Sequence, residues 1–327
     1  MTSKWRLTRI STVALLCMCL GSGCGNYSND DVDFQLALPD QGDLDAKLQV
    51  SVSRDDSAEY YKATYSAVHT FNSLIFKLTA LVESVRGYTP TSRSGSERIW
   101  GPFSDDKNPG WETRIVMRKS TDAHPLLHMD YWVQLRQVGQ DNSGWISLLV
   151  GQYTSQGSAR TGDGEIHFNV QDARDANYPV NNDPGLADLH HLDVCYVNSG
   201  DSTACKNTNG AATFVEMDLV NLPTTTKTQA ATYVYELAQD NSGHMQFDWQ
   251  VPTDNGRVVT ATMLSRWRAD GAGRADVIAD FTPQLPTQTT LGTDCWRPDT
   301  VATYSYRRYP PPMDPPEKGS AALCVFF

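Results

Sequence analysis

The sequence predicts an α+β fold in which one long N-terminal helix packs against a large, strongly curved antiparallel β-sheet. Three observations predict this fold. Apolar residues recur every three or four positions between residues 56 and 87, which is the period of a helix. Apolar and polar residues alternate over much of the stretch from residue 90 to residue 282, which is the period of a half-buried strand. Short segments rich in Asp, Asn, Ser and Gly separate the alternating runs, and such segments indicate antiparallel hairpins.

The first 23 residues have the pattern of a secretory signal peptide. Basic residues precede an apolar stretch at 10–20, and small residues follow at 21–23. The apolar stretch has about 11 residues, fewer than the roughly 20 that a membrane-spanning helix needs. We therefore expect residues 1–23 to direct export and to take no part in the fold.

Cys24 follows the leader directly. Residues 20–24, Leu-Gly-Ser-Gly-Cys, resemble the lipobox of bacterial lipoproteins, in which a Cys after small residues is diacylated and becomes the mature N-terminus. The segment departs from the usual pattern at Gly21, where Leu is preferred. The resemblance implies an anchor of acyl chains on Cys24, and Gly25 in place of Asp implies the outer membrane, facing the periplasm or the cell surface. The alternative is ordinary cleavage near Gly23 and a secreted product.

The remaining cysteines agree with export. Beyond the leader and Cys24 the chain has Cys195, Cys205, Cys295 and Cys324. Four cysteines in an oxidising compartment indicate two disulfides. Three connectivities are possible, and the sequential one, Cys195 with Cys205 and Cys295 with Cys324, closes the shortest loops. No pair has the Cys-x-x-Cys spacing that is common in zinc sites, so we expect no metal.

The long helix is predicted to begin at Asp56 and to end before Gly87. Asp56 and Glu59 fit a capping box, and Gly87 suits the left-handed residue that follows a helix. Apolar positions cover so much of the helix that we expect neighbours on most of its sides. The main apolar positions are Tyr61, Tyr65, Val68, Phe71, Ile75, Leu78, Val82 and Val85.

After Pro90 the alternation predicts about nine or ten strands up to residue 282. Met129 and Tyr131, for example, alternate with polar neighbours such as Asp130, so one face of the sheet is expected to be buried and the other wet. Trp132 stands on the otherwise polar face. An aromatic side chain there can contribute to a sugar or protein contact, or be covered by the tail.

Composition divides the rest of the chain. Residues 24–54 are acidic and have little periodicity, so we expect a lipidated N-terminus and a tether. The main domain is expected at 55–282, and the Pro-rich residues 283–327 are expected to form an extended tail that the second disulfide pins. The alternative is a two-layer domain followed by a separate sandwich from about residue 211.

A short repeat raises the question of two similar halves. The sequence Gln-Asp-Asn-Ser-Gly occurs at residues 140 and 239, on either side of an irregular stretch at 172–210. The repeat indicates either a duplicated meander with a break at that stretch, or a favourable turn sequence used twice.

The order of one long helix and then many strands is similar to the incomplete barrel of periplasmic lipoprotein carriers and outer-membrane lipoprotein receptors. The likeness is of element order only, covers residues 55 to 282 and rests on no shared motif. It implies a sheet that curls around the helix and a cavity for an apolar ligand between them. The side chains expected to line such a cavity are Tyr65, Phe71, Ile75, Tyr131, Phe168 and Trp249.

Charge and motifs exclude several function classes. The chain has 27 Lys and Arg against 38 Asp and Glu, and without the three basic residues of the leader the balance is 24 minus 38, or -14. Nucleic acids bind surfaces of the opposite sign, so we expect no nucleic-acid partner. No serine-hydrolase elbow, zinc-protease motif, phosphate loop or dinucleotide fingerprint is present, and no cofactor is predicted.

Two polar clusters carry potential metal ligands. His190 and His191 are adjacent, but adjacent residues of a strand point to opposite faces, and we expect a surface turn there. Asp172, Asp175 and Asp183 lie in an oxygen-rich run that could hold calcium. The run lacks the EF-hand spacing, and such Asp-rich and Asn-rich segments commonly form turns without an ion.

Three hypotheses for the function follow. The first is a membrane-anchored lipoprotein with a non-enzymatic binding or structural role in the envelope, in which the sheet surface binds an envelope protein. The second is a carrier of a lipid or other apolar ligand between helix and sheet. The third is an exported hydrolase that uses carboxylates on the wet face, for which Asp130, Glu165 and Asp248 are the candidates.

Overall fold

The computed structural model describes most of the chain after residue 28. Cys24 and the leader 1–23 lie outside the described residues. The described ranges are 29–39, 41–48, 56–83, 85, 87–120, 127–158, 161–182, 186–198, 202, 205, 211–222, 230–252, 258–280, 289–308 and 317–324.

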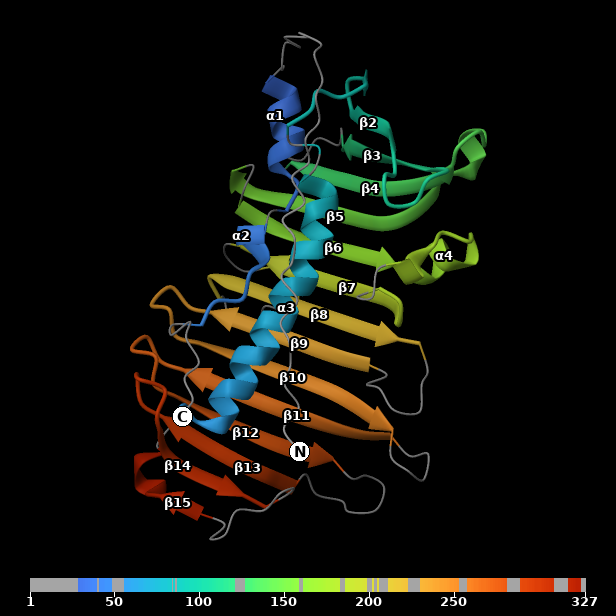
Figure 1. Cartoon of the computed structure of the whole chain (residues 1–327). Helices are drawn as coiled ribbons and strands as arrows, with labels where there is room; N and C mark the ends of the chain where they lie inside the picture. The colour runs from blue at the N-terminus through green and yellow to red at the C-terminus, as the bar shows by residue number, and fades with distance from the viewer. Residues whose placement is uncertain are drawn as a thin grey trace.

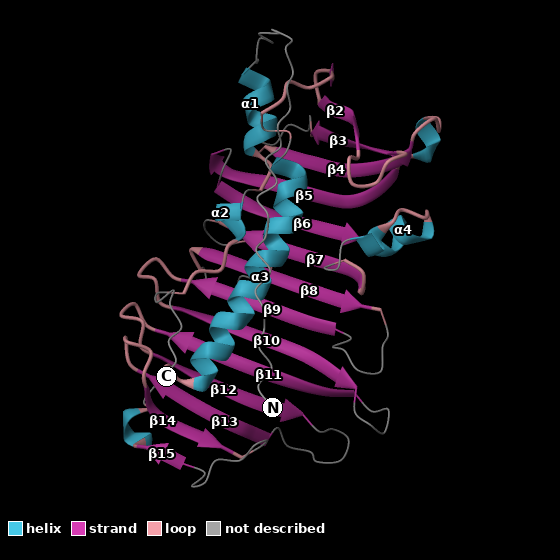
Figure 2. Cartoon of the chain, in the orientation of Figure 1, coloured by secondary structure: helices cyan, strands magenta, loops and turns pink. Residues whose placement is uncertain are grey.

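Within these residues, a single antiparallel sheet of 15 strands dominates the structure (Figures 1 and 2). Strand order follows chain order, so every strand pairs with its neighbours in the sequence. The sheet is not closed, because β1 and β15 are its two edges. The large antiparallel sheet is thus confirmed, whereas its strong curvature stays a prediction.

Twelve of the strands precede residue 281, more than the alternation alone predicts. They are β1 (Ser92–Arg93), β2 (Glu97–Ser104), β3 (Trp111–Lys119), β4 (His128–Gln137), β5 (Ile146–Ser158), β6 (Thr161–Asn169), β7 (Leu189–Val197), β8 (Thr213–Asn221), β9 (Ala230–Leu237), β10 (Gly243–Pro252), β11 (Val258–Trp267) and β12 (Gly273–Asp280). The last three are β13 (Thr289–Trp296), β14 (Ala302–Arg307) and β15 (Glu317–Gly319). Short 3-10 helices are η1 (Asn142–Gly144), η2 (Val180–Asn182) and η3 (Ala321–Leu323).

Helix α3 (Glu59–Glu83) lies obliquely across one face of the sheet (Figure 1). Its buried side chains pack on rings from the strands. The ring centroid of Tyr61 is 5.5 Å from that of Trp296 on β13, and Phe71 is 5.8 Å from Tyr233 on β9. Phe76 on the same helix is 54% exposed. The expectation of neighbours on most sides of the helix is therefore wrong at this position.

The start of α3 is fixed by the far end of the chain. The backbone N–H of Tyr60 donates to Asp294 Oδ2 on β13 at 2.8 Å. Asp294 is fully buried and also accepts from Arg307 Nη2 on β14 at 2.7 Å. A carboxylate at the first turn accepts from a helical N–H that has no partner within the helix, and its negative charge interacts favourably with the positive end of the helix dipole.

No helix in the described part of the chain is both long and apolar enough to cross a membrane.

Residues 29–48, which we expected to belong to an acidic tether, are part of the fold apart from residue 40, which is not described. They form α1 (Asn29–Leu36) and α2 (Gln41–Leu44). Phe34, Leu38 and Leu44 are at most 1% exposed and belong to the main core cluster. The tether prediction is wrong here because a few unevenly spaced apolar residues bury well even where the segment shows little helical period.

The Pro-rich tail also belongs partly to the sheet. Its segments at 289–296, 302–307 and 317–319 form β13, β14 and β15, so the prediction of an extended tail is wrong for them. The sequential disulfides are both confirmed, with Cα atoms 5.6 Å apart in Cys195–Cys205 and 5.4 Å apart in Cys295–Cys324.

The stretch predicted as a break contains β7 and most of a short helix, α4 (Val170–Asp175). Strand β7 pairs with β6 on one side and β8 on the other. The sheet is therefore continuous through this stretch, and the alternative of a separate sandwich from residue 211 is wrong.

Candidate functional site

The sheet face opposite α3 is polar. On β4, Met129 and Tyr131 are fully buried and belong to the core cluster that α3 shares. Asp130 and Trp132, which alternate with them, are half-buried on the other face. The prediction of one buried face and one wet face is confirmed for this strand.

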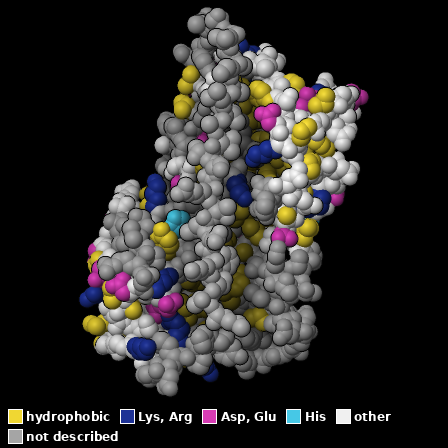
Figure 3. All heavy atoms as spheres, in the orientation of Figure 1, with side chains coloured by type: hydrophobic (Ala, Val, Ile, Leu, Met, Phe, Trp, Pro, Cys, Tyr) yellow, Lys and Arg dark blue, Asp and Glu magenta, His cyan; other side chains and the backbone are white. Residues whose placement is uncertain are grey.

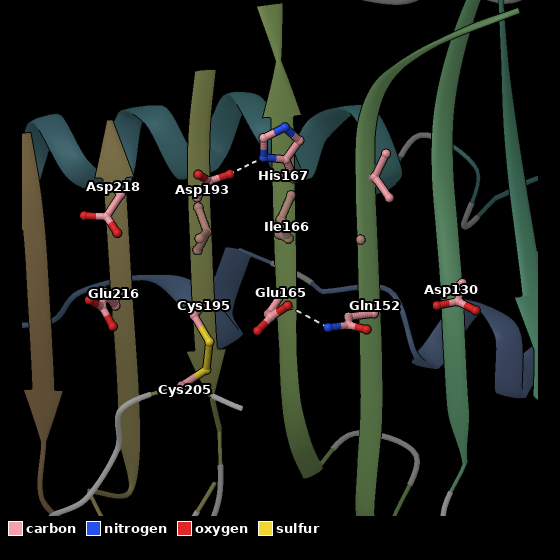
Figure 4. A pocket seen from close by; sticks show the side chains of 13 residues that line it. Asp130, Gln152, Glu165, Ile166, His167, Asp193, Cys195, Cys205, Glu216 and Asp218 are labelled. Carbon is pink, nitrogen blue, oxygen red and sulfur yellow. Dashed lines mark hydrogen bonds and ion pairs between the residues drawn. A yellow bond between two sulfur atoms is a disulfide. The ribbon is translucent and has the colours of Figure 1, made fainter. Parts of the chain in front are cut away.

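An open depression of about 490 Å³ lies on this polar face. It extends over β4 to β8, and Figure 4 shows its side chains standing out from these strands with α3 behind the sheet. Five carboxyl groups and one imidazole line it, and none of the described lining residues is a Lys or Arg. The carboxyl groups belong to Asp130, Glu165, Asp193, Glu216 and Asp218, and the imidazole to His167.

Strand register arranges these side chains in two rows. The first row runs Asp130, Gln152, Glu165, Cys195 and Glu216 across five neighbouring strands. Strands are about 4.8 Å apart, so successive members of the row are neighbours. Gln152 Nε2 donates to Glu165 Oε2 at 2.6 Å. The amide leaves the other oxygen of Glu165 available to the depression.

The second row places two aspartates opposite each other in register, with their carboxyl groups turned to opposite sides. Asp193 on β7 pairs in register with Asp218 on β8, and His167 on β6 lies on the other side of Asp193. His167 Nδ1 contacts Asp193 Oδ1, and Thr232 Oγ1 donates to Asp218 Oδ1 at 2.6 Å. Like charges opposite each other destabilise a sheet. The stability of the sheet alone therefore does not favour Asp193 opposite Asp218.

The acidic side chains are accessible. The side chains of Asp130 and Asp193 are 42% and 46% exposed, and that of His167 is 49% exposed. The Cys195–Cys205 disulfide lies at the depression, with Cys205 almost fully buried. This bond holds Cys205, from the chain after β7, against the sheet at the depression.

Basic and aromatic side chains occupy the polar face of β3 and β4, next to the depression. Arg118 lies opposite Asp130 in register, and its guanidinium carbon is 5.4 Å from the ring centroid of Trp132. Trp145 has Arg114 and Arg136 each at 4.2 Å from its ring centroid.

These guanidinium groups already have partners. The pKa of Arg114 is lowered mainly by burial and, to a smaller extent, by the nearby positive charge of Arg136. Arg118 Nε donates to Glu97 at 2.7 Å, and Arg136 Nε donates to Glu112 at 2.8 Å. The acidic depression is therefore bordered on one side by arginine side chains that these contacts hold in place.

The two adjacent histidines lie in strand β7 and not in the surface turn that we expected. A register shift between Leu189 and His191 marks an irregularity in the pairing with β8. The Nδ1 atoms of His190 and His191 are 2.8 Å apart, so the two rings meet although adjacent strand residues ordinarily point apart. His191 Nε2 lies 3.9 Å from Asp193 Oδ2, just beyond the depression.

The oxygen-rich run is partly helical where it is described. Asp172 and Asp175 lie in α4, where Gln171 Nε2 donates to Asp175 Oδ1 at 2.6 Å. Asp183 lies outside the described residues. Within the described ranges, no group of three or more His, Cys, Asp or Glu side chains is arranged to hold a metal ion.

The six side chains predicted to line an internal cavity are packed among other apolar residues. Four of them are at most 2% exposed in the main core cluster, and one packs against it from a half-buried position. Tyr131 rests on Gly151, where a Cβ atom would lie 2.1 Å from the ring. The four are Phe71, Ile75, Tyr131 and Phe168, the fifth is Trp249, and Tyr65 packs against a separate small cluster.

Of the three carboxylates in the hydrolase hypothesis, the structure brings two into one depression. Asp130 and Glu165 are separated only by Gln152 in the first row. Asp248 lies on β10, where Gln246 Nε2 donates to it at 2.6 Å, and it does not line the depression.

Three lining acids were missed as a group by the sequence analysis, namely Asp193, Glu216 and Asp218. The signal was present, because Glu216 and Asp218 flank the buried Met217 at the polar positions of their strand.

Comparisons of the chain with protein-family models, curated proteins and solved structures found no match.

Proposed function

We propose that this chain is an exported, outer-membrane lipoprotein with a non-enzymatic role, whose polar sheet face binds a positively charged segment of another envelope protein. The acyl chains on Cys24 would be the anchor. The leader pattern, the lipobox-like segment 20–24 and the two disulfides support export. The binding site in this proposal is the acid-lined depression.

The observation that carries the binding proposal is the pairing of Asp193 and Asp218 in register within a depression whose described lining has five carboxyl groups and no Lys or Arg. A positively charged ligand would reduce the repulsion in this pair. This reduction would contribute favourably to the free energy of binding. Asp130 and Glu165 extend the negative surface along the first row. An extended basic segment laid along the first row, across the strands, would meet Asp130, Glu165 and Glu216 in turn.

The test is binding of a fluorescent hexalysine peptide to the exported, disulfide-bonded protein, followed by anisotropy. The triple variant Glu165→Gln, Asp193→Asn and Asp218→Asn removes three charges from the depression and is expected to weaken binding about tenfold, or about 1.4 kcal/mol. Raising the salt from about 20 mM to about 300 mM should weaken binding to the unmodified protein, since accessible charges are screened.

A matched control removes three charges elsewhere. Asp141, Asp240 and Asp299 are exposed residues outside the depression, and their replacement by Asn gives the same net charge as the depression variant. The control variant is expected to bind hexalysine within about twofold of the unmodified protein, which is less than 0.5 kcal/mol. Equal losses in the two variants would mean that only net charge matters, and would overturn the depression as a specific site.

The carrier hypothesis makes a different prediction. A carrier exported without Cys24 would hold a stoichiometric apolar ligand, visible as a difference between its native mass and its mass after organic extraction. The tight packing of Phe71 and Tyr131 supports a filled core, so we expect the two masses to agree. If the masses show an extractable ligand instead, enclosed by a sheet strongly curved around α3, the carrier hypothesis replaces the binding proposal.

A further inference from the structure

Few residues separate the acylation site proposed at Cys24 from the folded part of the chain. Helix α1 begins at Asn29, five residues later. Five residues span at most about 18 Å even when fully extended. Any membrane that holds Cys24 is therefore within this distance of the start of α1.

Helix α1 is fastened to one end of the sheet. Asp31 is fully buried, and its carboxylate accepts from Arg98 Nε on β2 at 2.6 Å and from Arg93 Nε on β1 at 3.1 Å. Phe34 is 1% exposed, and the Arg98 guanidinium carbon lies 4.7 Å from the centre of its ring. Buried ion pairs of this kind hold one geometry, because losing either partner leaves an uncompensated charge. The position of α1 is thus coupled to β1 and β2.

The same end of the molecule exposes large apolar side chains. Val32 on α1 is 42% exposed, Tyr88 just before β1 is 47% exposed, and Phe103 on β2 is 38% exposed. The ring centroids of Tyr88 and Phe103 are 6.0 Å apart. Gln35 Nε2 donates to the Tyr88 carbonyl at 3.5 Å, and Val32 lies one helical turn from Gln35 on the same side of α1. We call Val32, Tyr88 and Phe103 the apolar tip.

We infer that the apolar tip is the surface by which the protein rests on the lipid bilayer. The inference depends on the proposed acylation of Cys24, which brings the bilayer within reach of α1. Aromatic and aliphatic side chains at the surface of a folded domain are stabilised at the headgroup region of a bilayer. Figure 3 shows hydrophobic side chains on the surface in the part of the view where Figure 1 labels β2 to β4.

This contact sets the orientation of the whole molecule. The 15 strands follow one another away from the tip, and at about 4.8 Å per strand the pairing direction measures about 67 Å. Strand β15 is then the part farthest from the membrane (Figure 1). The depression on β4 to β8 stands about 14 to 34 Å from β1 along this direction. A partner from the periplasmic or extracellular side would reach it without entering the lipid.

The test places a fluorophore at the tip of the full, lipidated protein in vesicles of phosphatidylethanolamine and phosphatidylglycerol. A single added thiol is made as Phe103→Cys, with Val32→Cys as a second tip site. Val258→Cys is the matched control, because Val258 is 45% exposed but lies on β11. Lipids with a spin label in the headgroup region should quench the tip fluorophores at least about twofold more than the control fluorophore, since only the tip lies at the interface.

Equal quenching at the three sites would overturn the inference. Spin labels at the same positions, in place of the fluorophores, would test whether another protein molecule covers the apolar tip. Strong coupling between labels at position 103 on two molecules would show that another copy of this chain covers the tip, and would also overturn it. The intact mass of the same samples separates this result from the proposed function. A protein without lipid on Cys24 contradicts the anchor itself, whereas a lipidated protein whose tip is not quenched contradicts only the orientation.

Discussion

The two faces of the sheet use the same strands for opposite purposes. Ile166, Val194 and Met217 are at most 3% exposed on the face that α3 covers. The residues immediately before and after each of them line the depression on the other face, and these are Glu165, His167, Asp193, Cys195, Glu216 and Asp218. The alternation along each strand therefore separates the apolar core from the acidic depression within a single layer.

Polar groups differ between the faces in the same way. On the covered side, Thr64 and Ser265 hydroxyl oxygens are 2.6 Å apart, and Asp294 is paired with Arg307. Buried polar groups need such partners because an unpaired one costs free energy. The open face instead tolerates Asp193 opposite Asp218. Three predictions test how far this division between the faces extends.

The largest effect is expected from loss of an aromatic ring on the covered face. Phe71→Ala should lower the free energy of unfolding by about 3 to 5 kcal/mol, because the ring is fully buried and leaves a cavity. Phe76→Ala is the matched control on the same helix, with 54% of Phe76 exposed, and should change stability by less than about 1 kcal/mol. Urea unfolding of the disulfide-bonded protein measures both, and similar losses would mean that α3 is not anchored through one side.

A smaller effect is expected from loss of a carboxylate on the covered face. Asp294→Ala should cost about 3 kcal/mol, since it leaves Arg307 buried without its partner and removes the acceptor for the Tyr60 N–H. Asp193→Ala, on the open face, should stay within about 0.5 kcal/mol of the unmodified protein. The same urea measurement decides this, and a large loss for Asp193→Ala would show that the depression has a structural role.

The smallest effect is a loss of stability at alkaline pH. Burial raises the pKa values of Tyr61, Tyr233 and Tyr235 to about 12, whereas an unfolded tyrosine titrates near 10. Their contribution to stability is therefore complete below about pH 10 and is lost as the pH rises towards 12, at about 1 kcal/mol for each residue at pH 11.

The variant Tyr233→Phe isolates one of these groups. It should reduce the loss of stability between about pH 8 and pH 11 by about 1 kcal/mol. Urea unfolding at the two pH values measures it, with tyrosinate absorbance as a second signal. Full ionisation of all tyrosines near pH 10 with unchanged circular dichroism would contradict the burial of these rings.

Local patterns predicted much of the fold. The alternation of Met129 and Tyr131 with Asp130 and Trp132 placed each residue on its correct face. Strand β7 was missed because Cys195 and the two histidines interrupt the alternation that marks other strands. The segment around Phe34 was assigned to a tether because its burial depends on residues more than 60 positions away, such as Arg98.

The candidate site was predictable only in part. Asp130 and Glu165 were correctly placed on the polar face, but nothing in the sequence indicated that a single strand separates them. The depression needs five strands in one register, and a shift of one residue in any strand would turn its carboxylates to the other face.

The sequence by itself determined the composition of each face, the leader pattern and the favoured pairing of the cysteines, because these depend on neighbours within a few positions or on short loops. Only the tertiary structure decided that all the strands form one open sheet, that α1 joins the end of the sheet, and that Asp193 faces Asp218. The physical reason is that a period of two fixes the side on which a residue lies, whereas its neighbour across the sheet depends on pairing between segments distant in the chain.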